Sequence, residues 1–119
     1  MNILVTGASK GIGNAIAHEL QNIGEVFVTG RNEKALIECN AKGFCVCDLS
    51  KDITTLTDFI EKNNIDVLIN NAGEYIYSDL DKMNIEDIQR LYQTNLIAPA
   101  FLASKVIPNM KNKKWGRII

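Results

Sequence analysis

The chain has 119 residues, 46% of them hydrophobic and 23% charged, with a net charge of −1 at neutral pH. The length is enough for one domain with a hydrophobic core. The net charge argues against a nucleic-acid-binding protein, which typically has a basic stripe. No apolar run approaches the roughly 18 residues of a membrane helix, and the N-terminus lacks the features of a secretory signal, so we expect a cytoplasmic protein that binds neither nucleic acid nor membrane.

Short apolar runs alternate with segments of helical periodicity along the whole chain. The apolar runs predict strands at residues 3–6, 26–29, 44–47 and 67–70, and a fifth strand that starts at residue 117. Helices are predicted at residues 11–23, 33–40, 51–63 and 85–111. Strands that are apolar on both faces and alternate with helices form parallel sheets covered on both sides. The pattern therefore predicts an α/β fold, a doubly wound parallel sheet flanked by helices.

Particular residues indicate where the helices begin and end. Gly24 stands at the expected stop of the first helix, and Ser50 is predicted to cap the third. Asn84 is predicted to cap the long fourth helix, and Asp87 favours its first turn. Pro99 lacks a backbone donor and should bend this helix.

The three cysteines are too few, and odd in number, for a disulfide framework. Cys45 and Cys47 alternate along a predicted strand and so share one face. We interpret them, with Cys39, as small buried residues in a reducing compartment. The alternative is a Cys-x-Cys metal site, but the only histidine is His18, so no metal is expected. His18 is predicted to face solvent, off the apolar stripe of the first helix. That stripe comprises Ile12, Ile16, Leu20 and Ile23.

A glycine-rich stretch, TGASKGIG at residues 6–13, joins the first strand to the first helix. A helix N-terminus leaves backbone N–H groups unpaired and has a partial positive charge, so a phosphate binds there if no side chain blocks it. The spacing of Gly7, Gly11 and Gly13 differs from the phosphate loop of nucleotide hydrolases and from Gly-x-Gly-x-x-Gly. A purely structural turn is the alternative interpretation.

The whole stretch resembles the cofactor loop of the short-chain dehydrogenase/reductase family, which has the spacing Thr-Gly-x3-Gly-x-Gly. Three further motifs follow in the family's order. They are Asp48-Leu49 after the third strand, Asn70-Asn71-Ala72-Gly73 after the fourth, and Asn95 within the long helix. The resemblance covers the entire chain and implies a Rossmann-type fold. We therefore expect residues 1–119 to be a single dinucleotide-binding domain, truncated after the fifth strand.

The resemblance also implies roles for individual residues. Asp48 would touch the adenine ring, Asn71 would tie neighbouring strands together, and Ala72 and Gly73 would let the cofactor's ribose pass close to the backbone. The implied dinucleotide-binding set is Gly7, Ser9, Lys10, Gly11, Ile12, Gly13, Arg31, Asp48, Leu49, Asn71, Ala72 and Gly73.

The residues near the end of the second strand favour one dinucleotide. Many dinucleotide folds place an acidic residue there to bind the ribose 2′-hydroxyl. Here the position is occupied by Arg31, whose guanidinium suits a 2′-phosphate, and Lys10 could approach the same phosphate. In the family, basic residues at these two places accompany NADP(H), which we therefore expect in preference to NAD(H). The alternative is that both are surface cations.

The family's catalytic serine and Tyr-x3-Lys pair have no counterpart in these residues. No tyrosine is followed by lysine at the fourth position. Asn95 is the only catalytic residue that the resemblance implies, because its backbone carbonyl would hold a water in the proton relay.

These features predict an oxidoreductase that transfers hydride between NADP(H) and a small carbonyl or alcohol, with reduction of 3-oxoacyl carrier-protein thioesters as one candidate. The alternatives are a non-catalytic dinucleotide-binding sensor or regulatory module, and an inactive fragment. We also expect a homo-oligomer, formed through the exposed face of the helix at residues 85–111.

Overall fold

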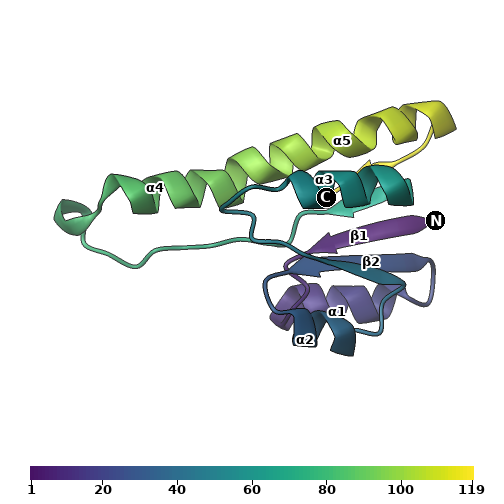
Figure 1. Cartoon of the computed structure of the whole chain (residues 1–119), viewed down its shortest axis with the longest axis horizontal. Helices are drawn as coiled ribbons and strands as arrows, with labels where there is room; N and C mark the ends of the chain where they lie inside the picture. The colour runs from purple at the N-terminus through teal and green to yellow at the C-terminus, as the bar shows by residue number, and fades with distance from the viewer.

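The computed structural model describes every residue from Met1 to Ile119. At its centre lies a five-stranded sheet in the order β3-β2-β1-β4-β5 (Figure 1), and every neighbouring pair is parallel. The strands are β1 (Asn2–Thr6), β2 (Glu25–Gly30), β3 (Gly43–Val46), β4 (Val67–Ile69) and β5 (Arg117–Ile118). The order reverses between β1 and β4, as in doubly wound Rossmann-type folds. The predicted fold class is confirmed.

Helices cover both faces of the sheet (Figure 1). The helices on one face are α1 (Gly11–Leu20) and α2 (Glu33–Glu38), and those on the other are α3 (Thr54–Asn63) and α5 (Ala98–Lys113). A further helix, α4 (Ile85–Tyr92), continues the line of α5 and projects beyond the sheet, which gives the molecule extents of 48 × 30 × 21 Å. A short 3₁₀ turn, η1 (Leu80–Lys82), precedes it. None of the helices combines the length and apolarity needed to cross a membrane.

Alternate residues of the strands belong to two separate cores. Ile3 and Val5 of β1 lie in the core beneath α1 and α2, whereas Leu4 lies in the core beneath α3 and α5. All three are at most 1% exposed. Burial of such a side chain stabilises the fold by about 1.5–3 kcal/mol. The cysteines are buried and unpaired, and Cys45 and Cys47 share the second core, as predicted.

The first helix differs from its prediction in length and orientation. It ends at Leu20, and Gly24 does not adopt a left-handed conformation. A Cβ on Gly24 would lie 2.7 Å from the Met1 carbonyl oxygen, so the glycine permits a close approach of chains and does not cap the helix. Ile12 and Ile23, predicted on the apolar stripe, are 74% and 63% exposed. The buried residues of this helix are instead the small Gly13 and Ala17. His18 faces solvent, as predicted.

The cap predicted for the third helix is also wrong. Ser50 does not start a helix, because its N–H and hydroxyl both donate to the Asp48 carboxylate, at 3.0 and 2.7 Å. The helix begins at Thr54, whose N–H donates to Asp52 at 2.9 Å. The N-cap position is Ile53, which makes no side-chain cap, so a favourable capping residue nearby in the sequence does not fix the start of this helix.

The long C-terminal rod has three parts, α4, a π-helical turn at Gln93–Ile97, and α5. The Asn84 cap is confirmed, since its side chain accepts a hydrogen bond from the Asp87 N–H at 2.8 Å. The irregularity expected at Pro99 takes the form of the π turn directly before it. A proline ring crowds the carbonyl four residues back, here that of Asn95, and the wider π turn makes room for it.

Asp66 is a buried carboxylate that joins the ends of three elements. It is 6% exposed, and it accepts hydrogen bonds from the Asn2 N–H at 2.9 Å and the Asn109 amide at 3.2 Å, and pairs with the Lys113 ammonium. Burial alone would raise the pKa of Asp66, but the hydrogen bonds from Lys113 and Asn2 outweigh it and hold the pKa below its ordinary value.

Asp66→Asn is expected to lower the free energy of unfolding at neutral pH by about 2 kcal/mol. A carboxyl with a lowered pKa stabilises the fold above its unfolded pKa, about 3.9. That contribution disappears as the pH falls through the folded pKa, so the difference between parent and variant should vanish in acid. Urea denaturation across the acidic range measures both effects, with the exposed Asp81→Asn as control. A difference that persists unchanged into acid would contradict the assignment.

Candidate functional site

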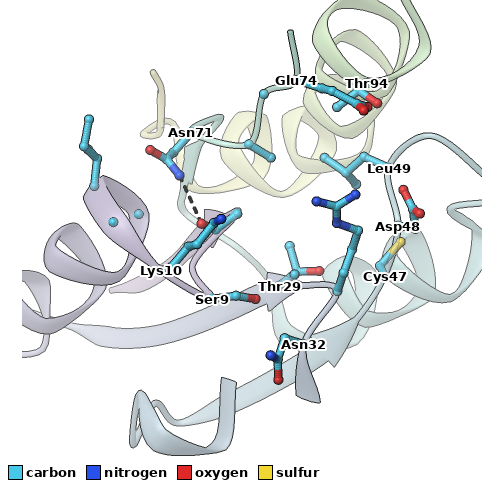
Figure 2. A pocket seen from close by; sticks show the side chains of 18 residues that line it. Ser9, Lys10, Thr29, Asn32, Cys47, Asp48, Leu49, Asn71, Glu74 and Thr94 are labelled. Atoms are coloured by element: carbon cyan, nitrogen blue, oxygen red, sulfur yellow. Dashed lines mark hydrogen bonds between the residues drawn. The ribbon is translucent and has the colours of Figure 1, made fainter. Parts of the chain in front are cut away.

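A pocket of about 590 Å³ opens at the carboxyl ends of the strands, where the strand order reverses. Ligands of α/β sheets bind in this crevice, and small-molecule sites span roughly 300–1,000 Å³. Figure 2 shows how its 18 lining residues converge from loops far apart in sequence. Every residue of the predicted dinucleotide-binding set lines this pocket. Six further lining residues lie outside that set: Thr29, Gly30, Asn32, Cys47, Glu74 and Thr94.

The glycines of the loop at residues 6–13 have different structural roles. A Cβ on Gly13 would lie 2.3 Å from Asn71 Nδ2 and 2.5 Å from the Gly7 carbonyl oxygen. A Cβ on Gly7 would lie 2.8 Å from Ala72 Cα. These two glycines therefore let the loops after β1 and β4 touch. Gly11 has a φ of +60° and open space around its Cβ position. Gly7 and Gly13 thus permit close packing, and Gly11 is the glycine whose Cβ position is open.

The N-terminus of α1 is open towards the pocket. Lys10 occupies the N-cap position in an extended conformation, with φ −166°, and no side chain caps the helix. The first N–H groups of α1 consequently lack intrahelical partners and present partial positive charge. Gly11, Ile12 and Gly13, which open the helix, all line the pocket. Helix N-termini of this kind are suited to bind anions.

Asn71 and Thr6 fasten the loop after β4 to the end of β1. Asn71 Nδ2 donates to the Thr6 carbonyl at 2.9 Å and the Gly7 carbonyl at 3.3 Å, and Figure 2 shows it reaching towards the glycine loop. The Thr6 hydroxyl accepts from the Ala72 N–H at 3.0 Å and lies 3.3 Å from the Ile69 carbonyl, to which it donates. The tie expected of Asn71 is present, and the matching role of Thr6 was not predicted.

Two cations border the pocket without acidic partners. Neither Lys10 nor Arg31 forms a salt bridge. Asp48 lines the same side of the pocket. Partial burial would raise the pKa of Asp48, but the two hydrogen bonds from Ser50 and the charge of Arg31 outweigh it and lower the pKa. The pocket therefore combines an ionised carboxylate with two cations that form no salt bridge within the chain.

Three buried hydroxyls in the pocket wall lack hydrogen-bond partners: those of Ser9, Thr29 and Thr94. A buried hydroxyl without a partner costs about 1–3 kcal/mol. These hydroxyls leave unsatisfied polar groups in the wall of the pocket. The free N–H groups, the two cations and the hydroxyls together fit a ligand that has both phosphates and sugar hydroxyls.

Asn95 lies outside the pocket lining but holds one of its walls. Its side chain pairs with the backbone of Glu74, accepting from the N–H at 2.8 Å and donating to the carbonyl at 2.6 Å. The Glu74 carboxylate in turn pairs with Arg90 Nε at 3.2 Å. The segment after Gly73 is thereby fixed against the π turn. The sequence pointed to the Asn95 backbone and missed this side-chain contact.

Asn95→Leu is expected to release Glu74 from the π turn. Loss of two hydrogen bonds should lower the stability of this wall by about 1–2 kcal/mol and speed exchange of the Glu74 amide hydrogen about tenfold. Hydrogen–deuterium exchange measures this directly. Gln93→Leu, in the same π turn but without a bond to Glu74, serves as control. Equal exchange in the two variants would contradict the contact.

The comparisons with known proteins agree with this geometry. The family model for short chain dehydrogenases matches residues 1–119. The chain belongs to the short-chain dehydrogenase family. It is 36% identical over 126 residues to the 3-oxoacyl-[acyl-carrier-protein] reductase FabG of Haemophilus influenzae, covering 98% of this chain and 52% of that protein. It therefore spans about half the length of the curated relatives that it matches.

Solved structures of short-chain dehydrogenases show the same fold. A Sphingobium yanoikuyae short-chain dehydrogenase in complex with NADPH superposes with a TM-score of 0.90 at 25% identity, covering 98% of this chain and 51% of that one. A metagenomic short-chain oxidoreductase in complex with NADP gives a TM-score of 0.86 at 32% identity, over 99% of this chain and 59% of that one. Membership of this family indicates a nicotinamide dinucleotide, and the pocket's donors and hydroxyls fit such a group.

Neither a reactive thiol nor a metal-binding cluster accompanies the short-chain dehydrogenase pocket. The Cys47 thiol lines the pocket, and burial, with the nearby Cys45, Asp48 and Asp52, raises its pKa to about 11. It remains protonated at neutral pH and is a poor nucleophile. Nowhere do three or more His, Cys, Asp or Glu side chains gather as a set that could hold a metal ion.

Proposed function

We propose that this pocket binds NADP(H) and that the complete gene product transfers hydride between NADP(H) and a carbonyl or alcohol substrate. The observation that supports this most directly is the uncapped N-terminus of α1 beside two unpaired cations, Lys10 and Arg31. Arg31, and not a carboxylate, directly follows β2, where NAD-binding folds place an acidic residue for the ribose 2′-hydroxyl. Relatives solved with NADPH and NADP support the same choice.

Each part of the pocket has a distinct role in this proposal. The first N–H groups of α1 bind the pyrophosphate, with Gly11 leaving the approach open. Lys10 and Arg31 pair with the 2′-phosphate, and Asp48 and Leu49 border the adenine. The backbone at 72–73 lies along the ribose of the nicotinamide half. The bound nicotinamide supplies or accepts the hydride, and the residues named here orient it.

Asn95 is proposed to position a water for proton transfer through its backbone carbonyl. In a regular α-helix that oxygen would accept from the residue four positions on, but this residue is Pro99, which has no N–H. The carbonyl therefore has no α-helical partner, which supports a role in binding water. The Asn95 side chain is hydrogen-bonded to the Glu74 backbone and so holds the π turn in place.

The substrate class that the relatives support is a 3-oxoacyl thioester, since FabG reductases are among the matches. The test is calorimetric titration of the complete gene product with NADPH and NADH, followed by absorbance assays of NADPH oxidation with 3-oxoacyl thioesters and simple ketones. Tighter binding of NADPH, with turnover, supports the proposal. Binding without turnover of any carbonyl would favour a sensor or regulatory module. No binding of either dinucleotide would refute the proposal and favour an inactive fragment.

We also propose a cytoplasmic homo-oligomer assembled through the rod formed by α4 and α5. No residue of α4 is buried, and large apolar side chains are exposed along the rod. These include Ile85, Tyr92, Leu96 and Phe101. Exposed apolar surface of this extent marks interaction sites. Light scattering of the parent and of Leu96→Glu tests this, and a monomeric parent would contradict it.

A further inference from the structure

The polar network around Cys39 links the two segments that bear the pocket's cations. Cys39 ends α2, is fully buried, and lies against Ala8 of the glycine loop. Its sulfur is 3.4 Å from the Ala8 carbonyl oxygen and 3.3 Å from that of Ala35, and its S–H donates to one of the two. Asn14 Nδ2 completes the network by donating to the Cys39 sulfur at 3.1 Å and to the Ala8 carbonyl at 3.3 Å.

The peptide groups of Ala8 are thereby held on both sides. Its N–H donates to the Thr29 carbonyl at 3.1 Å, at the end of β2. Its carbonyl accepts from Asn14 of α1 and faces the Cys39 thiol. Ala8 itself is fully buried. The direction of this carbonyl fixes the next peptide plane, and hence the course of the backbone through Ser9 to Lys10.

The second cation depends on the same network. Arg31 lies at the start of the loop before α2, and Cys39 lies at the far end of that short helix. Because Cys39 is bonded to the glycine loop, the network connects the end of α2 to the segment that leads to Lys10. Ser9 lies directly against Gly30 in the pocket wall, and the contacts of Asn14 and Cys39, outside the lining, support the same spacing between the Lys10 and Arg31 segments.

We infer that Asn14 and Cys39 are positioning residues for 2′-phosphate recognition, acting through the glycine loop and α2 without touching the cofactor. The inference rests on the proposed NADP(H) function. It implies that loosening the network weakens NADPH binding more than NADH binding, since only NADPH uses the spacing between the two cations.

The test compares Kd values for NADPH and NADH, with melting temperatures, in the complete gene product and three variants. Asn14→Leu removes the amide at similar volume, and Cys39→Ala independently removes the thiol. In both, the ratio of NADPH to NADH affinity should fall about three- to tenfold, the effect of one or two lost hydrogen bonds. Gln21→Leu is the matched control, because Gln21 also bonds Cys39 from α1, at 2.9 Å to its carbonyl, without contacting Ala8. Its ratio should stay within about twofold of the parent.

The outcomes separate this inference from the proposed function. A parent protein that shows no preference for NADPH would overturn the proposed function. A selective parent whose folded variants keep the same ratio would overturn the inference alone. An equal loss of affinity for both dinucleotides would also overturn it, because that result indicates only a structural contribution. The same holds if the ratio of NADPH to NADH affinity falls as much in Gln21→Leu as in the other two variants.

Discussion

Arg31→Asp is expected to weaken NADPH binding about 100-fold and to leave the Kd for NADH within about twofold. The guanidinium follows β2 at the pocket edge and forms no salt bridge, although its charge acts on the Asp48 carboxylate across the pocket. Charge-assisted hydrogen bonds from arginine to phosphate contribute about 1.5–3 kcal/mol each. Aspartate removes them and adds repulsion towards the 2′-phosphate, while offering an acceptor to the 2′-hydroxyl of NADH.

Calorimetric titration of both dinucleotides into the parent and variant measures the effect. Lys34→Asp, on the exposed side of α2, makes the same change of charge outside the pocket and is the control for long-range electrostatics. The Kd of Lys34→Asp for NADPH should differ from that of the parent by less than about threefold at physiological salt. Equal losses for NADPH and NADH in Arg31→Asp would show that Arg31 does not contact the 2′-phosphate.

The sheet and the position of the glycine loop could be predicted from sequence because their signals are local, whereas the other site motifs were identified by their resemblance to the short-chain dehydrogenase/reductase family. The run Val67–Ile69 is apolar at every position, which in a strand requires burial on both faces, and β4 is buried throughout. The glycine loop lies between a strand and a helix in the sequence, and the same order appears in the structure. The loops after successive parallel strands meet at one edge of the sheet, so motifs distant in sequence converge without further information.

The errors arose where a local preference was overruled by a tertiary contact. Ile12 fits an apolar helical stripe, yet it faces the pocket, and Gly13 takes the buried place because Asn71 and the Gly7 carbonyl leave no room for a side chain. The link from Cys39 to Ala8 spans 31 positions in the chain, and no spacing rule connects them. Thr94 reaches the pocket through the π turn, which shifts the helix face in a way that regular periodicity does not anticipate.

Gly13→Ala is expected to abolish measurable NADPH binding and to cost about 3 kcal/mol of stability. The added methyl would overlap Asn71 Nδ2 and the Gly7 carbonyl oxygen, both within 2.5 Å. The carbonyl is backbone and cannot rotate away, so α1 must move off the loop. That movement breaks the Asn71 bonds to Thr6 and Gly7 and displaces the N–H groups on which anion binding depends.

Gly11→Ala is the matched comparison, since both changes add one methyl group to the same loop. Nothing lies within 4 Å of its Cβ position, and only the φ of +60° opposes the change. The cost should be about 1–2 kcal/mol, with weaker but measurable NADPH binding. Urea denaturation and dinucleotide titration of both variants rank the two effects. If Gly13→Ala bound NADPH as well as Gly11→Ala, the close contact between the loops after β1 and β4 would not be what shapes the phosphate site, and the requirement for glycine at residue 13 would need another cause.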